Sequence, residues 1–98
     1  STHSFTIRHL VSIYILHHAH LSPDLALLSV NSWQKDLSDS NPVMRSLALK
    51  TLAGMSLESV LPLVMMSINR LLNDSNWFVR CTVAESLIDV FSVDASSY

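Results

Sequence analysis

The feature that most limits how this chain can fold is a nine-residue segment that occurs twice. LSDSNPVMR occupies residues 37–45, and LNDSNWFVR occupies residues 72–80, which is 35 residues later. Repeats with a period of about 20–50 residues are typical of proteins built from stacked units of secondary structure. A single unit of this kind cannot bury its apolar face alone, so we expect the two copies to stack on one another.

The composition favours helices as the repeated units. Of the 98 residues, 49% are apolar, whereas only one is glycine and three are proline. A β-sandwich would need turn signals roughly every 8–12 residues, and this chain has too few turn residues to supply them. We therefore expect an all-α fold.

Helix start and stop signals, together with apolar residues at helical spacing, divide the chain into five segments. Ser22-Pro23 and Asn41-Pro42 are typical pairs of N-cap and first helical residue, and Gly54 is expected to be a C-cap. The expected helices span roughly residues 5–20, 23–37, 42–54, 57–72 and 77–91. Because the connections are short, successive helices run antiparallel. Residues 1–98 are thus predicted to be a single segment of a HEAT- or armadillo-type α-solenoid, taken from a longer chain.

Two helices have features of their own. The first is apolar on most of its circumference, which predicts that it belongs to a hairpin whose other helix precedes this segment. Pro62 falls inside the fourth predicted helix, so it either bends that helix or marks its beginning.

Four charged residues recur at the repeat interval, with Asp39 aligned to Asp74 and Arg45 aligned to Arg80. Each arginine falls in the first turn of its helix, where the helix dipole disfavours a cation. The aspartate six residues earlier lies in the interhelical turn, close enough to pair with the arginine of its own or an adjacent repeat. We interpret these four residues, the Asp–Arg ladder, as structural.

Residues that bind metals or act as nucleophiles are present, but not in a pattern that indicates a site. His17 and His20 share a helical spacing, yet no nearby cysteine completes a tetrahedral zinc site. Cys81 has no helper close in sequence, so we expect a small packed thiol. The remaining histidines are His3, His9 and His18. We expect no catalytic residue, no bound metal and no cofactor.

Some large apolar residues are assigned to the core by their spacing. Met65 and Met66 suggest a plastic binding surface, but helical spacing favours burial. Trp33 and Trp77 fall at different points of the repeat, and burial is the default expectation for both.

The charge distribution argues against nucleic-acid binding, and the longest apolar run is too short for a membrane-spanning helix. The net charge is −2 and the six basic residues are dispersed, so the basic stripe of a nucleic-acid-binding protein is missing. The longest unbroken apolar run falls far short of the ~20 residues that a membrane-spanning helix needs. The single cysteine fits a reducing compartment, and we expect a soluble, cytoplasmic segment.

Residues 21–55 resemble the trunk of the large β chains of clathrin-adaptor complexes. That family carries a Pro-Asp pair, an apolar helix ending in Asn-Ser-aromatic, a Lys-Asp pair, and Asp-x-Asn-Pro-x-x-Arg before an Ala/Leu-rich helix. Here the corresponding residues are Pro23-Asp24, Asn31-Ser32-Trp33, Lys35-Asp36, Asp39-Ser40-Asn41-Pro42 and Arg45. The preceding LVSIYILHHA at residues 10–19 is also similar to the family.

Within that family, LPLVMMSINRLLND at residues 61–74 is most similar to the β subunit of adaptor protein complex three. In that subunit, as between Pro62 and Asp74 here, a proline lies twelve residues before the turn aspartate. A double methionine follows that proline. The second repeat departs from the family at Trp77, where proline is usual, and at residues 81–83, where lysine and alanine are common.

The resemblance implies a non-enzymatic scaffold segment of a vesicle-coat adaptor, used in intracellular protein transport and cargo sorting. Its partners would be the other subunits of a heterotetrameric complex, with indirect membrane association through that complex. It would be cytoplasmic and peripheral on Golgi, endosomal or coated-vesicle membranes. In relatives the Pro-Asp helix contributes to docking of an Arf-type small GTPase, and the matching apolar positions are Leu27 and Val30. Burial of both side chains in the solenoid is the alternative.

Two other functions fit the same residues. One is a different helical-repeat scaffold, such as coatomer, a nuclear transport receptor or a phosphatase scaffold. The other is a small enzyme that depends on a metal at the histidines or on the thiol of Cys81, and stoichiometric zinc or turnover lost with Cys81→Ala would reveal it.

Overall fold

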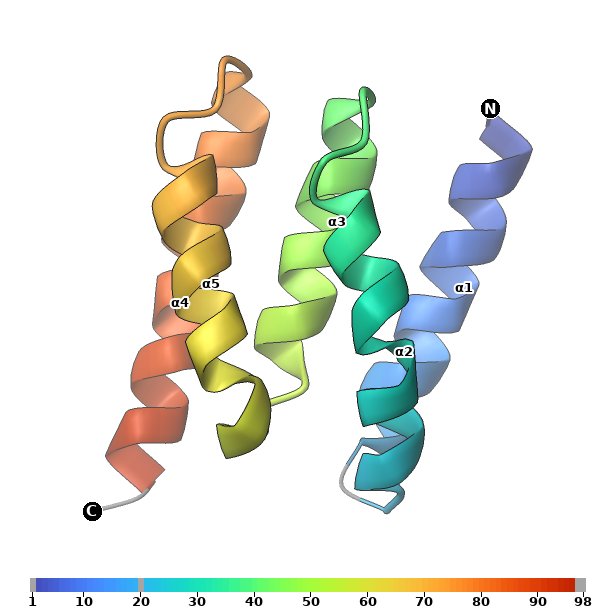
Figure 1. Cartoon of the computed structure of the whole chain (residues 1–98), viewed down its shortest axis with the longest axis vertical. Helices are drawn as coiled ribbons and strands as arrows, with labels where there is room; N and C mark the ends of the chain where they lie inside the picture. The colour runs from blue at the N-terminus through green and yellow to red at the C-terminus, as the bar shows by residue number, and fades with distance from the viewer. Residues whose placement is uncertain (1, 20, 97–98) are drawn as a thin grey trace.

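In the computed structural model, the residues described form five α-helices (Figure 1). The structure describes residues 2–19 and 21–96, with the side chains of 5–19 and 21–91. The helices are α1 (Thr2–His18), α2 (Pro23–Asp36), α3 (Pro42–Gly54), α4 (Leu61–Leu71) and α5 (Trp77–Ser96), with a 3-10 turn, η1 (Glu58–Val60), before α4. The described residues contain no strand, and the all-α prediction is confirmed.

The helices lie in two layers within a body of 38 × 26 × 17 Å. Helices α1, α3 and α5 run in one direction in one layer, and α2 and α4 run in the opposite direction in front of them (Figure 1). The turn before α3 and the turn before α5 lie at the same end of the molecule. This is the arrangement expected of stacked antiparallel hairpins, and the α-solenoid prediction is confirmed.

Helix α3 lies at the centre of the stack and contacts all four other helices. Residues 46–49 and 51–53 are therefore buried around most of its circumference, and the face of Val43 and Lys50 is exposed. Trp33 of α2 and Val79 and Val83 of α5 complete the core around it. Burying each aliphatic side chain contributes roughly 1.5–3 kcal/mol, so α3 carries much of the stability.

A buried pair of hydroxyl groups links α1 to α3. The Ser12 Oγ and Thr51 Oγ1 atoms lie 2.6 Å apart, and Thr51 also donates to the carbonyl of Leu47. Because both hydroxyls are thereby hydrogen-bonded, their burial does not carry the cost of an unsatisfied polar group.

The helix ends differ from the sequence-based bounds in places. Helix α1 spans 2–18 instead of 5–20, and α5 continues to Ser96 instead of ending near residue 91. Helix α4 begins at Leu61 instead of residue 57, which places Pro62 in its first turn. Proline lacks the N–H that would bond to a preceding turn, so Pro62 marks the beginning of the helix rather than a bend within it.

Ser22 is the N-cap residue of α2 and Pro23 its first helical residue, as predicted, but the Ser22 hydroxyl makes no capping hydrogen bond. The prediction of Gly54 as a C-cap is wrong. Gly54 is the last residue of α3, and the left-handed conformation occurs instead at Ser56, with φ of 54°. A Cβ atom on Gly54 would lie 2.9 Å from Cδ2 of Leu16. The glycine therefore permits close packing of α1 on α3 rather than a left-handed turn.

Three side chains predicted to be buried are exposed instead. Met66 is 67% exposed and Met65 about half, because the buried positions of α4 begin at Val64 and resume at residues 67 and 68. Trp77 is 67% exposed, in contrast to the fully buried Trp33.

Cys81 is exposed as well and is not the packed thiol that the sequence predicts. It lies between the buried positions Val79 and Thr82 of α5, on the outward side of that helix.

Candidate functional site: repeated turns joined by an arginine

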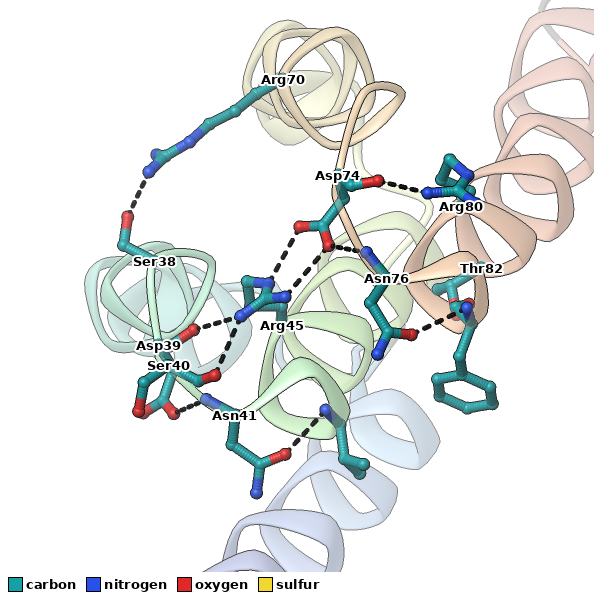
Figure 2. A network of polar contacts seen from close by, with 12 residues as sticks. Ser38, Asp39, Ser40, Asn41, Arg45, Arg70, Asp74, Asn76, Arg80 and Thr82 are labelled. Carbon is teal, nitrogen blue, oxygen red and sulfur yellow. Dashed lines mark hydrogen bonds and ion pairs between the residues drawn. The ribbon is translucent and has the colours of Figure 1, made fainter.

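The two copies of the repeated segment form the same hydrogen-bonded turn (Figure 2). In the first copy, the Asp39 carboxylate accepts from the Asn41 N–H at 2.8 Å, and the Asn41 side chain accepts from the Val43 N–H at 2.9 Å. In the second, Asp74 accepts from the Asn76 N–H at 2.9 Å, and Asn76 accepts from the N–H of residue 78 at 2.8 Å. Each asparagine is thus an N-cap, held in place by the aspartate before it.

Each arginine returns to the turn that precedes its own helix. Arg45 Nη1 donates to the main-chain carbonyl oxygens of Asp39, at 2.8 Å, and Ser40, at 3.2 Å. Arg80 Nη1 donates in the same way to the main-chain carbonyl of Asp74, at 2.5 Å. Within a repeat, the arginine therefore bonds to the backbone of the aspartate and not to its carboxylate.

The carboxylate contact is made between repeats. Arg45 Nε donates to Asp74 Oδ2 at 2.9 Å, and Arg45 Nη2 donates to Asp74 Oδ1 at 3.0 Å. The side chains are only 15% and 9% exposed, respectively. This bidentate pair joins the first turn of α3 to the turn before α5, and its two parallel bonds fix the orientation of both groups. Among the described residues, no cation forms a salt bridge with Asp39.

The paired geometry changes the acidity of Asp74. The hydrogen bonds from Arg45 are the main reason that the pKa of this carboxyl group lies below its ordinary value of 3.8. Burial opposes that shift, whereas the Asn76 N–H and the positive charges of Arg45 and Arg80 add to it. Asp74 is therefore ionised at neutral pH and carries the charge that the pair requires.

A second charged pair joins α1 to α2. Arg8 Nε and Nη2 donate to Asp36 Oδ2 at 2.9 and 2.6 Å, and the guanidinium lies 4.2 Å from the ring centroid of the buried Trp33. Sequence reasoning missed this pair because Arg8 is not at a repeat-equivalent position. The two pairs share a similar separation in sequence, since 28 residues separate Arg8 from Asp36 and 29 separate Arg45 from Asp74.

The histidines and Cys81 do not converge. Among the residues that the structure describes, no three His, Cys, Asp or Glu side chains are grouped so as to hold a metal. His18 stacks on Tyr14 with centroids 4.2 Å apart, and its Nδ1 atom lies 2.9 Å from the Tyr14 carbonyl oxygen. His20 and the side chain of His3 lie outside the description.

The two residues implied in small-GTPase docking differ in accessibility. Leu27 of α2 is 41% exposed. Val30 is partly buried and packs against the hydrophobic core. Leu27 is thus available to a partner, whereas Val30 also supports the solenoid.

Stacked helix pairs with conserved geometry at each turn define the chain as part of an α-solenoid, a class of protein that presents helix faces to its partners. Over residues 1–98 the sequence matches the family described as the Adaptin N terminal region. The chain belongs to this family. None of the helices in the described ranges is long and apolar enough to cross a membrane.

The chain is similar to β subunits of adaptor complexes. It is 47% identical over 85 residues, 87% of its length, to the AP-3 complex subunit beta of Eremothecium gossypii, of which it covers 11%. It is 35% identical over its whole length to the corresponding subunit of Saccharomyces cerevisiae, of which it covers 12%. Over 91% of its length it is 32% identical to the AP-3 complex subunit beta-2 of Mus musculus, of which it covers 8%. The chain therefore spans about a tenth of the relatives that it matches, and the predicted likeness to an adaptor β chain is confirmed.

Proposed function

We propose that this segment is a non-enzymatic scaffold within the trunk of a vesicle-coat adaptor used in intracellular protein transport and cargo sorting. The observation that carries the proposal is the match of the whole chain to the Adaptin N terminal region, with AP-3 complex β subunits among its relatives. The repeated hydrogen-bonded turns and the part-buried Arg45–Asp74 pair support it, because structural contacts between stacked repeats suit a rigid array better than a reacting site.

The partners that follow are the other subunits of a heterotetrameric adaptor complex. We place the protein in the cytoplasm, peripheral on Golgi, endosomal or coated-vesicle membranes and attached through the complex. Neither catalysis nor nucleic-acid binding is part of the proposal.

Isolation of the full-length protein from its own cells tests this assignment. A tagged full-length chain should copurify with a second large subunit, a medium subunit and a small subunit in equal amounts, as measured by quantitative mass spectrometry. A matched chain lacking residues 1–98 shows how far this segment contributes to assembly. Purification of the full-length protein without such subunits would contradict the proposal.

We further propose that Leu27 contributes to docking of an Arf-type small GTPase. Its support is the family resemblance of α2 and the exposure of the Leu27 side chain. Binding of the chain to the GTP-loaded GTPase in a pull-down should be weakened by Leu27→Asp and by Val30→Asp. Leu28→Asp is a suitable control, because Leu28 is the neighbouring residue and is 80% exposed. Equal binding by all three folded variants and the wild type would exclude this contact.

A further inference from the structure

A polar cleft separates α2 from α4 on the front layer of the molecule. Its volume is about 520 Å³, and it is lined by Asn31, Gln34, Lys35, Ser38 and Arg70. Arg70 Nη2 donates to Ser38 Oγ at 2.5 Å, so the guanidinium reaches from α4 toward the end of α2 (Figure 2). The lining groups supply two positive charges and two carboxamides, all of which can donate hydrogen bonds to an anion.

The two cations of this cleft have no anionic partner. Among the described residues, neither Lys35 nor Arg70 forms a salt bridge, and both side chains are exposed. In the described part of the chain, no carboxylate lines the cleft. Of the carboxylates close to it in sequence, Asp36 pairs with Arg8, and that of Asp39 accepts the Asn41 N–H. The cleft is therefore locally positive on a chain whose net charge is −2.

An apolar depression adjoins the cleft. It has a volume of about 40 Å³ and includes Leu37, Leu63 and Met66 in its lining. Gln34 and Arg70 line both hollows, so the two are adjacent. The exposed Met66, whose flexible thioether adapts to different shapes, offers contact to one apolar side chain.

We propose that this α2–α4 cleft binds an acidic peptide segment of a partner protein. A carboxylate of the peptide lies between Lys35 and Arg70, and a neighbouring apolar side chain contacts Met66. Charge complementarity and the adjoining apolar depression carry this assignment.

The same geometry disfavours an anionic membrane as the ligand. Recognition of an anionic lipid surface usually takes clusters of about 4–8 basic residues, whereas this cleft has two. A peptide side chain can also enter a cleft, whereas a flat membrane surface cannot. The cleft and the GTPase contact involve different residues, so a result that excludes one of them does not affect the other.

Selection from a random dodecapeptide display library, using the full-length protein, tests the proposal. The enriched peptides should carry Asp or Glu beside Leu, Met or Phe. Their synthetic versions should bind at least about tenfold more weakly to Lys35→Glu and to Arg70→Glu, measured by fluorescence anisotropy. Met66→Ala should weaken binding through the apolar contact alone.

Lys50→Glu is the charge-matched control, because Lys50 lies on α3 outside the cleft. It should leave peptide binding unchanged, and thermal unfolding confirms that each variant is folded. The proposal is overturned if the selection yields no peptide or peptides without acidic residues, or if folded cleft variants bind as wild type does. Cosedimentation with phosphatidylserine vesicles that is lost in the Lys35→Glu variant would assign the cleft to a membrane and overturn it too.

Discussion

Arg45 contacts two repeats at once. Its Nη1 group bonds to the turn of its own repeat, while Nε and Nη2 bond to the Asp74 carboxylate of the next. The positive charge at the start of α3, unfavourable with respect to the helix dipole, is offset by a carboxylate and two carbonyl groups. Arg80 repeats only the contact with its own turn, so the two arginines allow the contribution of the carboxylate to be measured.

We expect Arg45→Ala to lower the free energy of unfolding by about 2–3 kcal/mol, because it leaves the mostly buried Asp74 without its partner. Arg80→Ala should cost only about 0.5–1.5 kcal/mol, since it removes a single bond to a carbonyl. Urea unfolding followed by circular dichroism gives both values. Similar losses for the two variants would show that the carboxylate pair adds little.

The lowered pKa of Asp74 predicts how stability depends on pH. A carboxyl group whose pKa is lower in the folded state stabilises the fold above its unfolded pKa, and that contribution is lost as the pH falls through the folded value. The stability difference between wild type and Asp74→Asn should therefore be constant from about pH 7 to pH 5. This stability difference should shrink as the pH falls below 3.8, the ordinary pKa of an aspartate carboxyl group. A difference that stays constant on acidification to about pH 3, measured by urea unfolding at each pH, would contradict the prediction.

At the scale of elements, local signals predicted helix starts better than they predicted contacts. Asn41 caps α3 as the sequence predicts, and Asn76 caps α5 in the same way, because an N-cap depends on residues within three positions. The exposure of Met66 and the role of Gly54 depend instead on which neighbour covers each face, and no local pattern contains that information. For the same reason, the sequence alone allows Arg45 to pair with either Asp39 or Asp74.

The identical turns predict that Trp77 can be replaced by proline. Pro42 occupies the equivalent position before α3, and Trp77 is exposed. Trp77→Pro should raise the free energy of unfolding by about 0.4–1 kcal/mol, because it restricts the unfolded chain without removing a capping bond. Phe78→Pro is the matched control and should destabilise, since it removes the N–H that Asn76 accepts. Thermal unfolding of both variants would test this, and destabilisation by Trp77→Pro would mean that the two turns are not equivalent.

At the scale of the whole molecule, apolar side chains are exposed toward both ends of the stack. Leu10, Leu21 and Leu28 are exposed on the α1–α2 side, and Ile88 and Phe91 are exposed on α5. Removing apolar surface from water contributes about 25 cal/mol per Å², so these faces favour association with another apolar surface.

The isolated segment should therefore self-associate as its concentration rises, as measured by sedimentation velocity. The double variant Leu28→Glu/Ile88→Glu should sediment as a monomer of 10.9 kDa over the same range. Replacement of exposed polar positions by glutamate, as in Asn31→Glu/Ser75→Glu, is the control and should leave association unchanged. A wild-type segment that is monomeric throughout would contradict the prediction.

The contact between Arg45 and Asp74 also gives the stack a direction. One repeat contributes its guanidinium and the following repeat contributes its carboxylate, so the two surfaces in contact are different. Heterologous contacts of this kind propagate without closing unless the rotation per unit completes a ring. The number of units in such an array is consequently set by how many repeats the polypeptide encodes, and successive hairpins add in one sense only.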